Sequence, residues 1–175
     1  PVAMEVFAGR LYGLDTGANE IWEFDSVDGV FNQRPGRYFV DVAYDLSDLL
    51  DFAIAQGDVF LLHGDGRLTS CTRGGADESA RCADLTFSDG RQGRSDGPRI
   101  DGAVPFRLIY DPPPEPSLYF VDTLAYGVYQ DSLKLVFQRQ FRPLRPFPAP
   151  VTAVAVGPNK TLYLAAGDNI YFADR

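Results

Sequence analysis

The chain of 175 residues is long enough for one domain with a sizeable core, and its 45% hydrophobic and 23% charged residues are ordinary for a soluble globular protein. No apolar run approaches the ~18 residues that a membrane helix needs, so we expect no direct membrane insertion. The net charge of −8 repels phosphate backbones and argues against nucleic acid as a partner.

A short pattern recurs four times along the chain: an aliphatic residue, an aromatic residue, any residue, an aliphatic or small residue, and then a turn. The aromatic residues are spaced by 48, 59 and 44 residues, which is the period of a four-stranded propeller blade. The occurrences are 11–15, 59–63, 118–122 and 162–166, with Tyr12, Phe60, Tyr119 and Tyr163 as the aromatic residues.

Each occurrence is predicted to be the second strand of a unit, because an apolar strand precedes it and a turn and a further strand follow it. Strands are expected at 2–7, 11–15, 21–24 and 37–40 in the first unit, and at 52–55, 59–63, 68–71 and 84–87 in the second. They are expected at 106–110, 118–122, 128–130 and 135–141 in the third unit, and at 151–156, 162–166 and 170–172 in the last. Strand 151–156 is apolar on both faces, as expected for an inner strand packed between blades.

The sequence therefore predicts an all-β fold, with 1–175 forming a single β-propeller domain or partial propeller. Four four-stranded blade units are visible, at about 2–41, 49–88, 105–142 and 151–175, and the last unit is incomplete. Because only Pro1 precedes the first strand, no strand remains to complete the last blade, and we favour part of a larger propeller over a closed ring of four blades. An open arc would leave apolar blade faces and strand edges for self-association.

Residues 11–25, with the sequence LYGLDTGANEIWEFD, resemble the NHL repeat, a family of propeller blades. Asp122-Thr123 echoes the same motif in the third unit, whereas the second and fourth units match only in their strand pattern. The resemblance implies a disc of blades around a central channel, with ligands bound on the loop faces. It says little about function, because one fold hosts many functions.

The two cysteines, Cys71 and Cys82, flank a Gly-rich, polar stretch at 72–81 that reads as a hairpin loop. If the flanking strands pair, the sulfurs meet across the ladder, so a disulfide and an oxidising, extracytoplasmic location are expected. The alternative is two unpaired small apolar residues in a reducing cytosol. No zinc site is expected, since there is no CxxC pair and His63 is the only histidine.

Three polar residues occupy matching positions after the second strand of their units: Asp15, His63 and Asp122. Matching positions of a propeller lie on one face around one axis, so these side chains are a candidate ligand-binding site for a metal or for proton transfer. The alternative is that each caps its own tight turn. Ala166 holds the fourth position and contributes no polar group.

Three further features have a functional and a structural interpretation. Segment 88–105 is a candidate binding loop, or an insertion between blades, and it lacks the spacing of an EF-hand calcium loop. The Pro-rich segment 142–150 is a partner-docking stretch or a stiff crossover to the next blade. Trp22 packs between blades or provides a stacking platform for a ring ligand.

No nucleotide-binding glycine motif and no Gly-x-Ser-x-Gly elbow occurs in the sequence. We therefore expect a non-catalytic binding or scaffold domain, without a cofactor, that binds an unidentified protein or small molecule and forms the sensor or extracytoplasmic part of a longer protein. The alternative is a metal-dependent propeller hydrolase or lactonase that holds calcium among Asp15, His63 and Asp122.

Overall fold

The computed structural model describes residues 1–32, 34–40, 44–75, 78–88, 96–99, 105–111, 116–122, 128–131, 137–141, 145 and 147–173. For 105, 106, 122, 128–131, 137–141 and 173 it describes the backbone alone. Among these residues there is no helix with the length and hydropathy of a membrane span.

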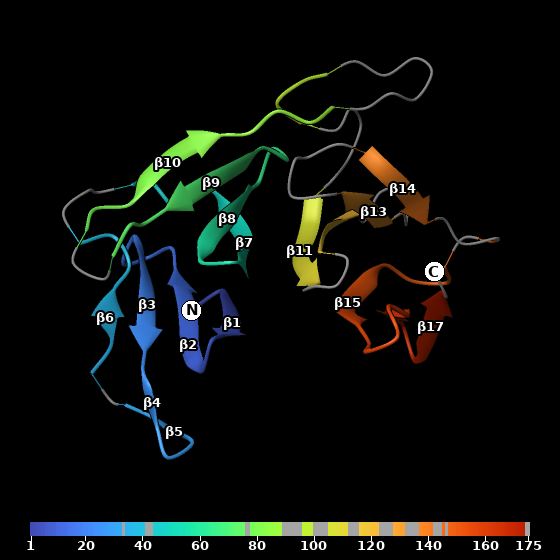
Figure 1. The fold of residues 1–175 in the computed structure, drawn as a ribbon. Helices are drawn as coiled ribbons and strands as arrows, with labels where there is room; N and C mark the ends of the chain where they lie inside the picture. The colour runs from blue at the N-terminus through green and yellow to red at the C-terminus, as the bar shows by residue number, and fades with distance from the viewer. Residues whose placement is uncertain are drawn as a thin grey trace. The chain divides into compact units, whose positions relative to one another are not determined.

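The described residues form four larger antiparallel sheets that follow one another along the sequence, and one two-stranded sheet (Figure 1). We call the four larger sheets blades 1 to 4. Blade 1 contains β1 (Ala3–Phe7), β2 (Arg10–Asp15), β3 (Glu20–Phe24) and β6 (Gly36–Arg37), and blade 2 contains β7 (Leu49–Ala55), β8 (Asp58–His63), β9 (Leu68–Thr72) and β10 (Arg81–Asp84). Blade 3 contains β11 (Pro105–Asp111), β12 (Ser117–Asp122), β13 (Val128–Asp131) and β14 (Phe137–Phe141), and blade 4 contains β15 (Val151–Val156), β16 (Leu162–Ala166) and β17 (Asn169–Ala173). A small hairpin of β4 (Ser26–Val27) and β5 (Val30–Phe31) lies between β3 and β6 in the sequence.

The predicted repeat is confirmed, because its four aromatic residues lie one in each sheet, always on the second strand. Two outer strands differ from the prediction. Strand β10 covers Arg81–Asp84 rather than 84–87, because Cys82 pairs with Cys71 and sets the register three residues earlier. Strand β6 has only two residues. The backbone N–H of Tyr38 still donates to the carbonyl oxygen of Ile21 at 2.9 Å, but that of Phe39 donates to the Glu20 carboxylate, and both aromatic side chains enter the core.

The chain divides into two compact units, Pro1–Asp84 with blades 1 and 2, and Leu85–Arg175 with blades 3 and 4. Each unit is described by itself. The expectation that residues 1–175 form one domain stays a prediction.

In blades 1 and 2 the inner strand turns into the second strand through the same tight hairpin. Ala8 and Gly9 have φ values of 49° and 77°, and Gln56 and Gly57 have values of 56° and 96°. Two successive residues with positive φ are typical of a type I′ turn, whose twist matches that of the paired strands. Glycine at the second position avoids the steric penalty of that conformation.

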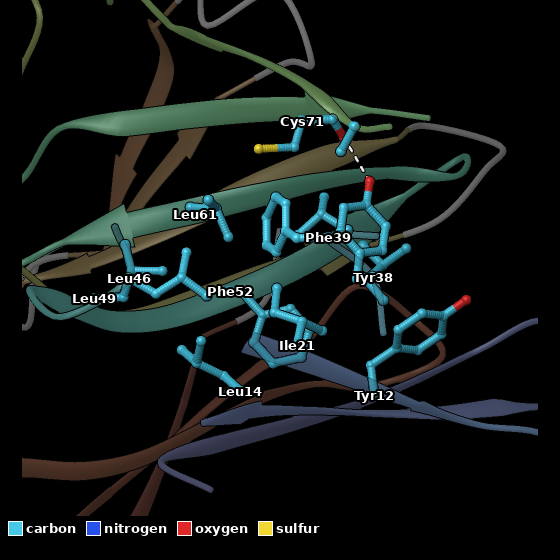
Figure 2. Close-up of a cluster of buried hydrophobic side chains, with 13 residues drawn as sticks. Tyr12, Leu14, Ile21, Tyr38, Phe39, Leu46, Leu49, Phe52, Leu61 and Cys71 are labelled. Atoms are coloured by element: carbon cyan, nitrogen blue, oxygen red, sulfur yellow. Dashed lines mark hydrogen bonds between the residues drawn. The ribbon is translucent and has the colours of Figure 1, made fainter. Parts of the chain in front are cut away.

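Blades 1 and 2 pack face to face around a shared core (Figure 2). Strands β1 and β7 are neighbours at this interface. Phe52, Leu61, Leu14 and Ile21 are fully buried in it, and each such side chain stabilises the fold by about 1.5–3 kcal/mol. The segment between the blades supplies Tyr38, Phe39 and Leu46 to the same core, and the hydroxyl of Tyr38 donates a hydrogen bond of 3.0 Å to the carbonyl oxygen of Cys71.

Two polar side chains at the start of β3 hold this connecting segment in place. The buried carboxylate of Glu20 accepts hydrogen bonds from the backbone N–H of Phe39 at 3.0 Å and from Arg37 Nε at 2.6 Å. The amide of Asn19 donates to the carbonyl oxygen of Tyr44 at 2.6 Å and accepts from the N–H of Leu46 at 2.7 Å. Three backbone groups of the connecting segment, at Phe39, Tyr44 and Leu46, are thereby paired by side chains of blade 1.

The predicted disulfide is present in blade 2. Cys71 and Cys82 are directly opposite each other on β9 and β10, with their Cα atoms 4.1 Å apart. Closely spaced cross-strand positions bring the two Cβ atoms within reach of a bond. The hairpin interpretation of the intervening stretch is therefore confirmed.

Candidate functional site

Asp15 ends β2 and caps the turn that follows. Its Oδ1 accepts a hydrogen bond of 2.9 Å from the backbone N–H of Ala18. This hydrogen bond stabilises the charged carboxylate and holds the pKa of Asp15 below its ordinary value. The contact is the local turn-capping arrangement that the sequence offered as an alternative, and a ligand role for Asp15 stays a prediction.

His63 ends β8, the corresponding strand of blade 2, and its side chain is buried. Its Nδ1 lies 2.9 Å from Asp48 Oδ1, and its Nε2 lies 2.9 Å from Thr69 Oγ1. Both ring nitrogens are therefore engaged within the protein. In this arrangement the imidazole joins the end of β8 to the segment before β7, through Asp48, and to β9, through Thr69.

The hydroxyl of Thr69 is the centre of a polar cluster at this end of blade 2. It donates to Asp84 Oδ1 at 2.7 Å and accepts from the Tyr44 hydroxyl at 3.3 Å, in addition to its contact with His63. The order carboxylate, imidazole, hydroxyl is that of an activated nucleophile. Thr69 is however fully buried and shared among three partners, so the cluster holds the strands together and presents no nucleophile to solvent.

Arg67 completes the cluster on the solvent side. Its guanidinium lies 2.9 Å from Asp65, 3.3 Å from Asp84 and 3.7 Å from Asp48. One cation thus faces three carboxylates, all of them substantially exposed. Exposed pairs of this kind contribute little stability each and leave this end of blade 2 acidic.

Asp122 is the last residue of β12, where its backbone pairs with Pro105. Its side chain is outside the described residues, as are most of the candidate loop 88–105 and part of segment 142–150. Asp15 and His63 are thus placed at matching ends of blades 1 and 2, whereas a ligand role for Asp122 stays a prediction.

Sequence reasoning missed a pair of carboxyl groups on the inner strands of blades 1 and 2. Glu5 lies in the middle of β1, and the buried Asp51 lies on the neighbouring β7. Burial, reinforced by the negative charge of Asp51, raises the pKa of Glu5 to about 7. A single carboxylate inside an otherwise apolar strand was the available signal, as in the sequences AMEVF and LLDFAIA.

A recurring β-bulge sets the position of Asp51. The register of the first two strands shifts between Leu49 and Asp51 in blade 2, and at the matching places in blades 3 and 4, before Arg107 and Ala153. A bulge adds one residue to a strand and redirects the side chain that follows it. The sequence pattern carries no sign of this extra residue.

Calcium takes six to eight oxygen ligands. Within the part of the chain that the structure describes, no three His, Cys, Asp or Glu side chains gather in the way a metal ion requires. Glu5 and Asp51 alone do not form such a set, so these residues do not fit a calcium site, and we derive no metal-dependent step.

No protein-family model and no curated protein matches this sequence. The fold, however, is similar to that of solved structures. The chain is similar to streptogramin B lyase (TM-score 0.56, 13% identity), covering 98% of this chain and 53% of that one. It is similar to a luciferin-regenerating enzyme (TM-score 0.58, 14% identity, 93% and 52% covered) and to Ycf48 bound to D1 peptide (TM-score 0.55, 9% identity, 97% and 48% covered).

The identities are too low to indicate more than a common fold. The chain spans about half the length of the structures it matches. The four antiparallel sheets and these similarities together establish that the protein has the all-β fold of β-propellers.

Proposed function

We propose that this chain is a non-catalytic β-propeller domain that binds a protein or small-molecule ligand through its loops. The observation that carries the proposal is the internal use of the predicted site side chains. Asp15 caps its turn, and His63 has both ring nitrogens bonded to Asp48 and Thr69. Groups held in this way build loop structure, and loops placed by a rigid scaffold are where binding surfaces form.

The similar structures are compatible with this function without deciding it. Ycf48 is solved with a peptide bound, whereas the other two proteins are named as enzymes. Because one fold serves both kinds of protein, the function has to be argued from the residues.

The test compares two variants: one in the turn that follows a second strand, where Asp15 and His63 lie, and one in the hairpin that precedes a second strand. Ala18→Arg alters the turn after β2, and Gln56→Arg alters the hairpin before β8; both positions are exposed. A partner captured by crosslinking in the native host is purified and titrated against each variant. We expect weaker binding for Ala18→Arg and unchanged binding for Gln56→Arg. Equal affinity of both variants would contradict a binding site on the Asp15 and His63 loops.

The alternative is a metal-dependent hydrolase or lactonase. Its metal would need ligands beyond Glu5 and Asp51, and the one observation that favours a hydrolase is the raised pKa of Glu5 beside Asp51. A carboxyl group with a pKa near 7 is suited to proton transfer at neutral pH. Bound calcium in the purified protein, together with lactone hydrolysis that is lost in Glu5→Gln, would favour this alternative. A metal-free protein that calcium does not stabilise against heat would remove it.

We also propose that this domain, whose blades are NHL-like, resides outside the cytoplasm as the sensor or extracytoplasmic part of a longer protein. The disulfide supports this location, because such bonds persist in oxidising compartments. Cell fractionation of the native host, with a cytosolic marker as control, tests the proposal. Recovery of the protein with the cytosolic marker, its cysteines reduced, would contradict it.

A further inference from the structure

Blades 1 and 2 show how one blade covers the next. The face of blade 1 that packs on blade 2, which we call its forward face, contributes buried side chains from alternate positions of β2 and β3. The face of blade 2 that receives it, which we call a backward face, does the same from β7, β8 and β9. The forward set is Tyr12, Leu14 and Ile21, and the backward set is Phe52, Ile54, Val59, Leu61 and Cys71.

The same interface recurs between blades 3 and 4, whose inner strands β11 and β15 are neighbours. Tyr119 matches Tyr12 and belongs to the forward face of blade 3. The backward face of blade 4 contributes Val154, Val156, Leu162, Leu164 and Tyr171. The repeat thus specifies which side chains of any blade face forward and which face backward.

On the backward face of blade 1 the inner-strand side chains are apolar and exposed. The strand register places Met4, Gly13 and Trp22 in one row across the sheet, and Val6, Leu11 and Phe24 in the next. Val2, Met4 and Val6 are 52%, 65% and 63% exposed. The matching rows of blade 2, which begin with Phe52 and Ile54, are buried under blade 1.

The forward face of blade 4 is exposed in the same way. Its rows are Ala155, Tyr163 and Phe172, and Ala153, Ala165 and Ile170. Tyr163, Ile170 and Phe172 are 42%, 73% and 71% exposed. These positions match those with which blade 1 covers blade 2, among them Tyr12 and Ile21.

We propose that a second copy of this chain covers both faces. The forward face of blade 4 in one copy packs on the backward face of blade 1 in the other, and the reverse contact forms at the same time. The two faces are the complementary halves of an interface that the chain already forms twice. The chain spans about half of the propellers it matches, and eight blades is within the range of this fold.

The chemistry of the two faces suits such a contact. The row led by Val6 and the two rows of blade 4 contain no charged side chain, and the row led by Met4 has one only at its outer end, where Arg37 is paired with Glu20. Little desolvation of charge therefore opposes their burial. Trp22 is at the centre of the blade 1 face, and tryptophan is enriched among residues that dominate binding energy. In the proposed dimer Trp22 packs between blade 1 of one copy and blade 4 of the other, and does not serve as a stacking platform for a ring ligand.

The test is the molar mass of the chain in solution, measured by light scattering and sedimentation over a range of concentrations. We expect a dimer of the 19.3 kDa chain. Met4→Asp and Phe172→Asp should each weaken dimerisation by at least roughly 30-fold, because each damages both contacts. Val30→Asp is the matched control, because Val30 is 70% exposed on the β4–β5 hairpin, outside both faces.

Mixing the two variants distinguishes this arrangement from a symmetric face-to-face dimer. A mixture of Met4→Asp and Phe172→Asp chains retains one undamaged contact, so we expect a mixed dimer that neither variant forms alone. Trp22 fluorescence and circular dichroism verify that each variant is folded. Dissociation by only one of the two substitutions, or a monomer at every concentration, would overturn the proposal. Burial of both faces by further blades of a longer native chain, without a second copy, would also overturn the proposal.

Discussion

Reduction of the bond between Cys71 and Cys82 is expected to destabilise the unit Pro1–Asp84. The two cysteines are 11 positions apart in the sequence. Closing a loop of that length lowers the entropy of the unfolded chain by an amount equivalent to about 2.8 kcal/mol at room temperature. Cys71 is fully buried, and a reduced cysteine packs as a small apolar residue. The folded state therefore loses the covalent link and keeps its contacts.

The assay is urea unfolding monitored by the fluorescence of Trp22, the only tryptophan, which lies in the same unit. With an m-value of about 1.5 kcal/mol/M, the loss corresponds to a shift of the midpoint by roughly 2 M. The protein is refolded with and without a phosphine reductant before each titration. A thiol assay under denaturing conditions should count no free thiol before reduction and two after it.

The control is the double variant Cys71→Ala with Cys82→Ala, whose midpoint should not respond to the reductant. It should already unfold near the midpoint of the reduced native sequence. A shift below about 0.5 M, with two thiols counted, would refute the loop-entropy argument. Such a result would mean that the hairpin between β9 and β10 is already closed in the unfolded state.

Further substitutions separate buried from exposed polar contacts. Arg73→Ala should lower the free energy of unfolding by about 3 kcal/mol, because it leaves the largely buried Glu23 carboxylate without its partner. Arg10→Ala removes the ion pair with the exposed Asp25 and should lower the free energy of unfolding by less than about 1 kcal/mol in the same urea assay. Thr69→Val should lower it by about 1–3 kcal/mol, because the buried His63 ring loses the hydrogen-bond partner of its Nε2. An unchanged midpoint would contradict the place of the Thr69 hydroxyl at the centre of the polar cluster. Glu5 has a folded pKa of about 7, raised above its ordinary 4.5, so its contribution to stability is present below pH 4.5 and is lost as the pH rises through 7. The urea midpoint should therefore fall between pH 5 and 8 more steeply in the native sequence than in Glu5→Gln, and equal slopes would contradict the raised pKa.

The contact between Arg73 and Glu23 illustrates how the two blades of the first unit are joined. The guanidinium of Arg73 lies 2.5 Å from Glu23 Oε1 and 4.6 Å from the centre of the Tyr38 ring. It also donates to the carbonyl oxygen of Tyr38 at 3.3 Å. One side chain on the loop after β9 thus binds the outer part of blade 1 in three ways. Burial makes each of these contacts stronger than it would be at the surface.

The blade repeat was predictable because it depends on local pattern. An aromatic residue after an aliphatic one, at a period near that of a four-stranded sheet, requires no knowledge of partners, and Tyr12 and its three counterparts did fall in separate sheets. The cysteine pair was predictable for the same reason, since its hairpin is short. Outer strands were predicted less well, because the ladder ends where the Phe39 N–H turns to the Glu20 carboxylate and the Tyr38 and Phe39 side chains become buried, which sequence alternation does not record.

By itself, the sequence determined the all-β class and the order of the sheets, since these follow from the side-chain period of a strand and from short-range pairing. It favoured the disulfide but left two unpaired cysteines as the alternative, and the structure decided between them. Only the tertiary structure decided what the polar residues do. The pKa of Glu5 depends on burial and on Asp51, 46 positions further along the chain. The role of His63 depends on Asp48 and Thr69, which lie on either side of it in the fold. Desolvation and hydrogen bonding are properties of the packed neighbourhood, and that neighbourhood exists only once the blades have assembled.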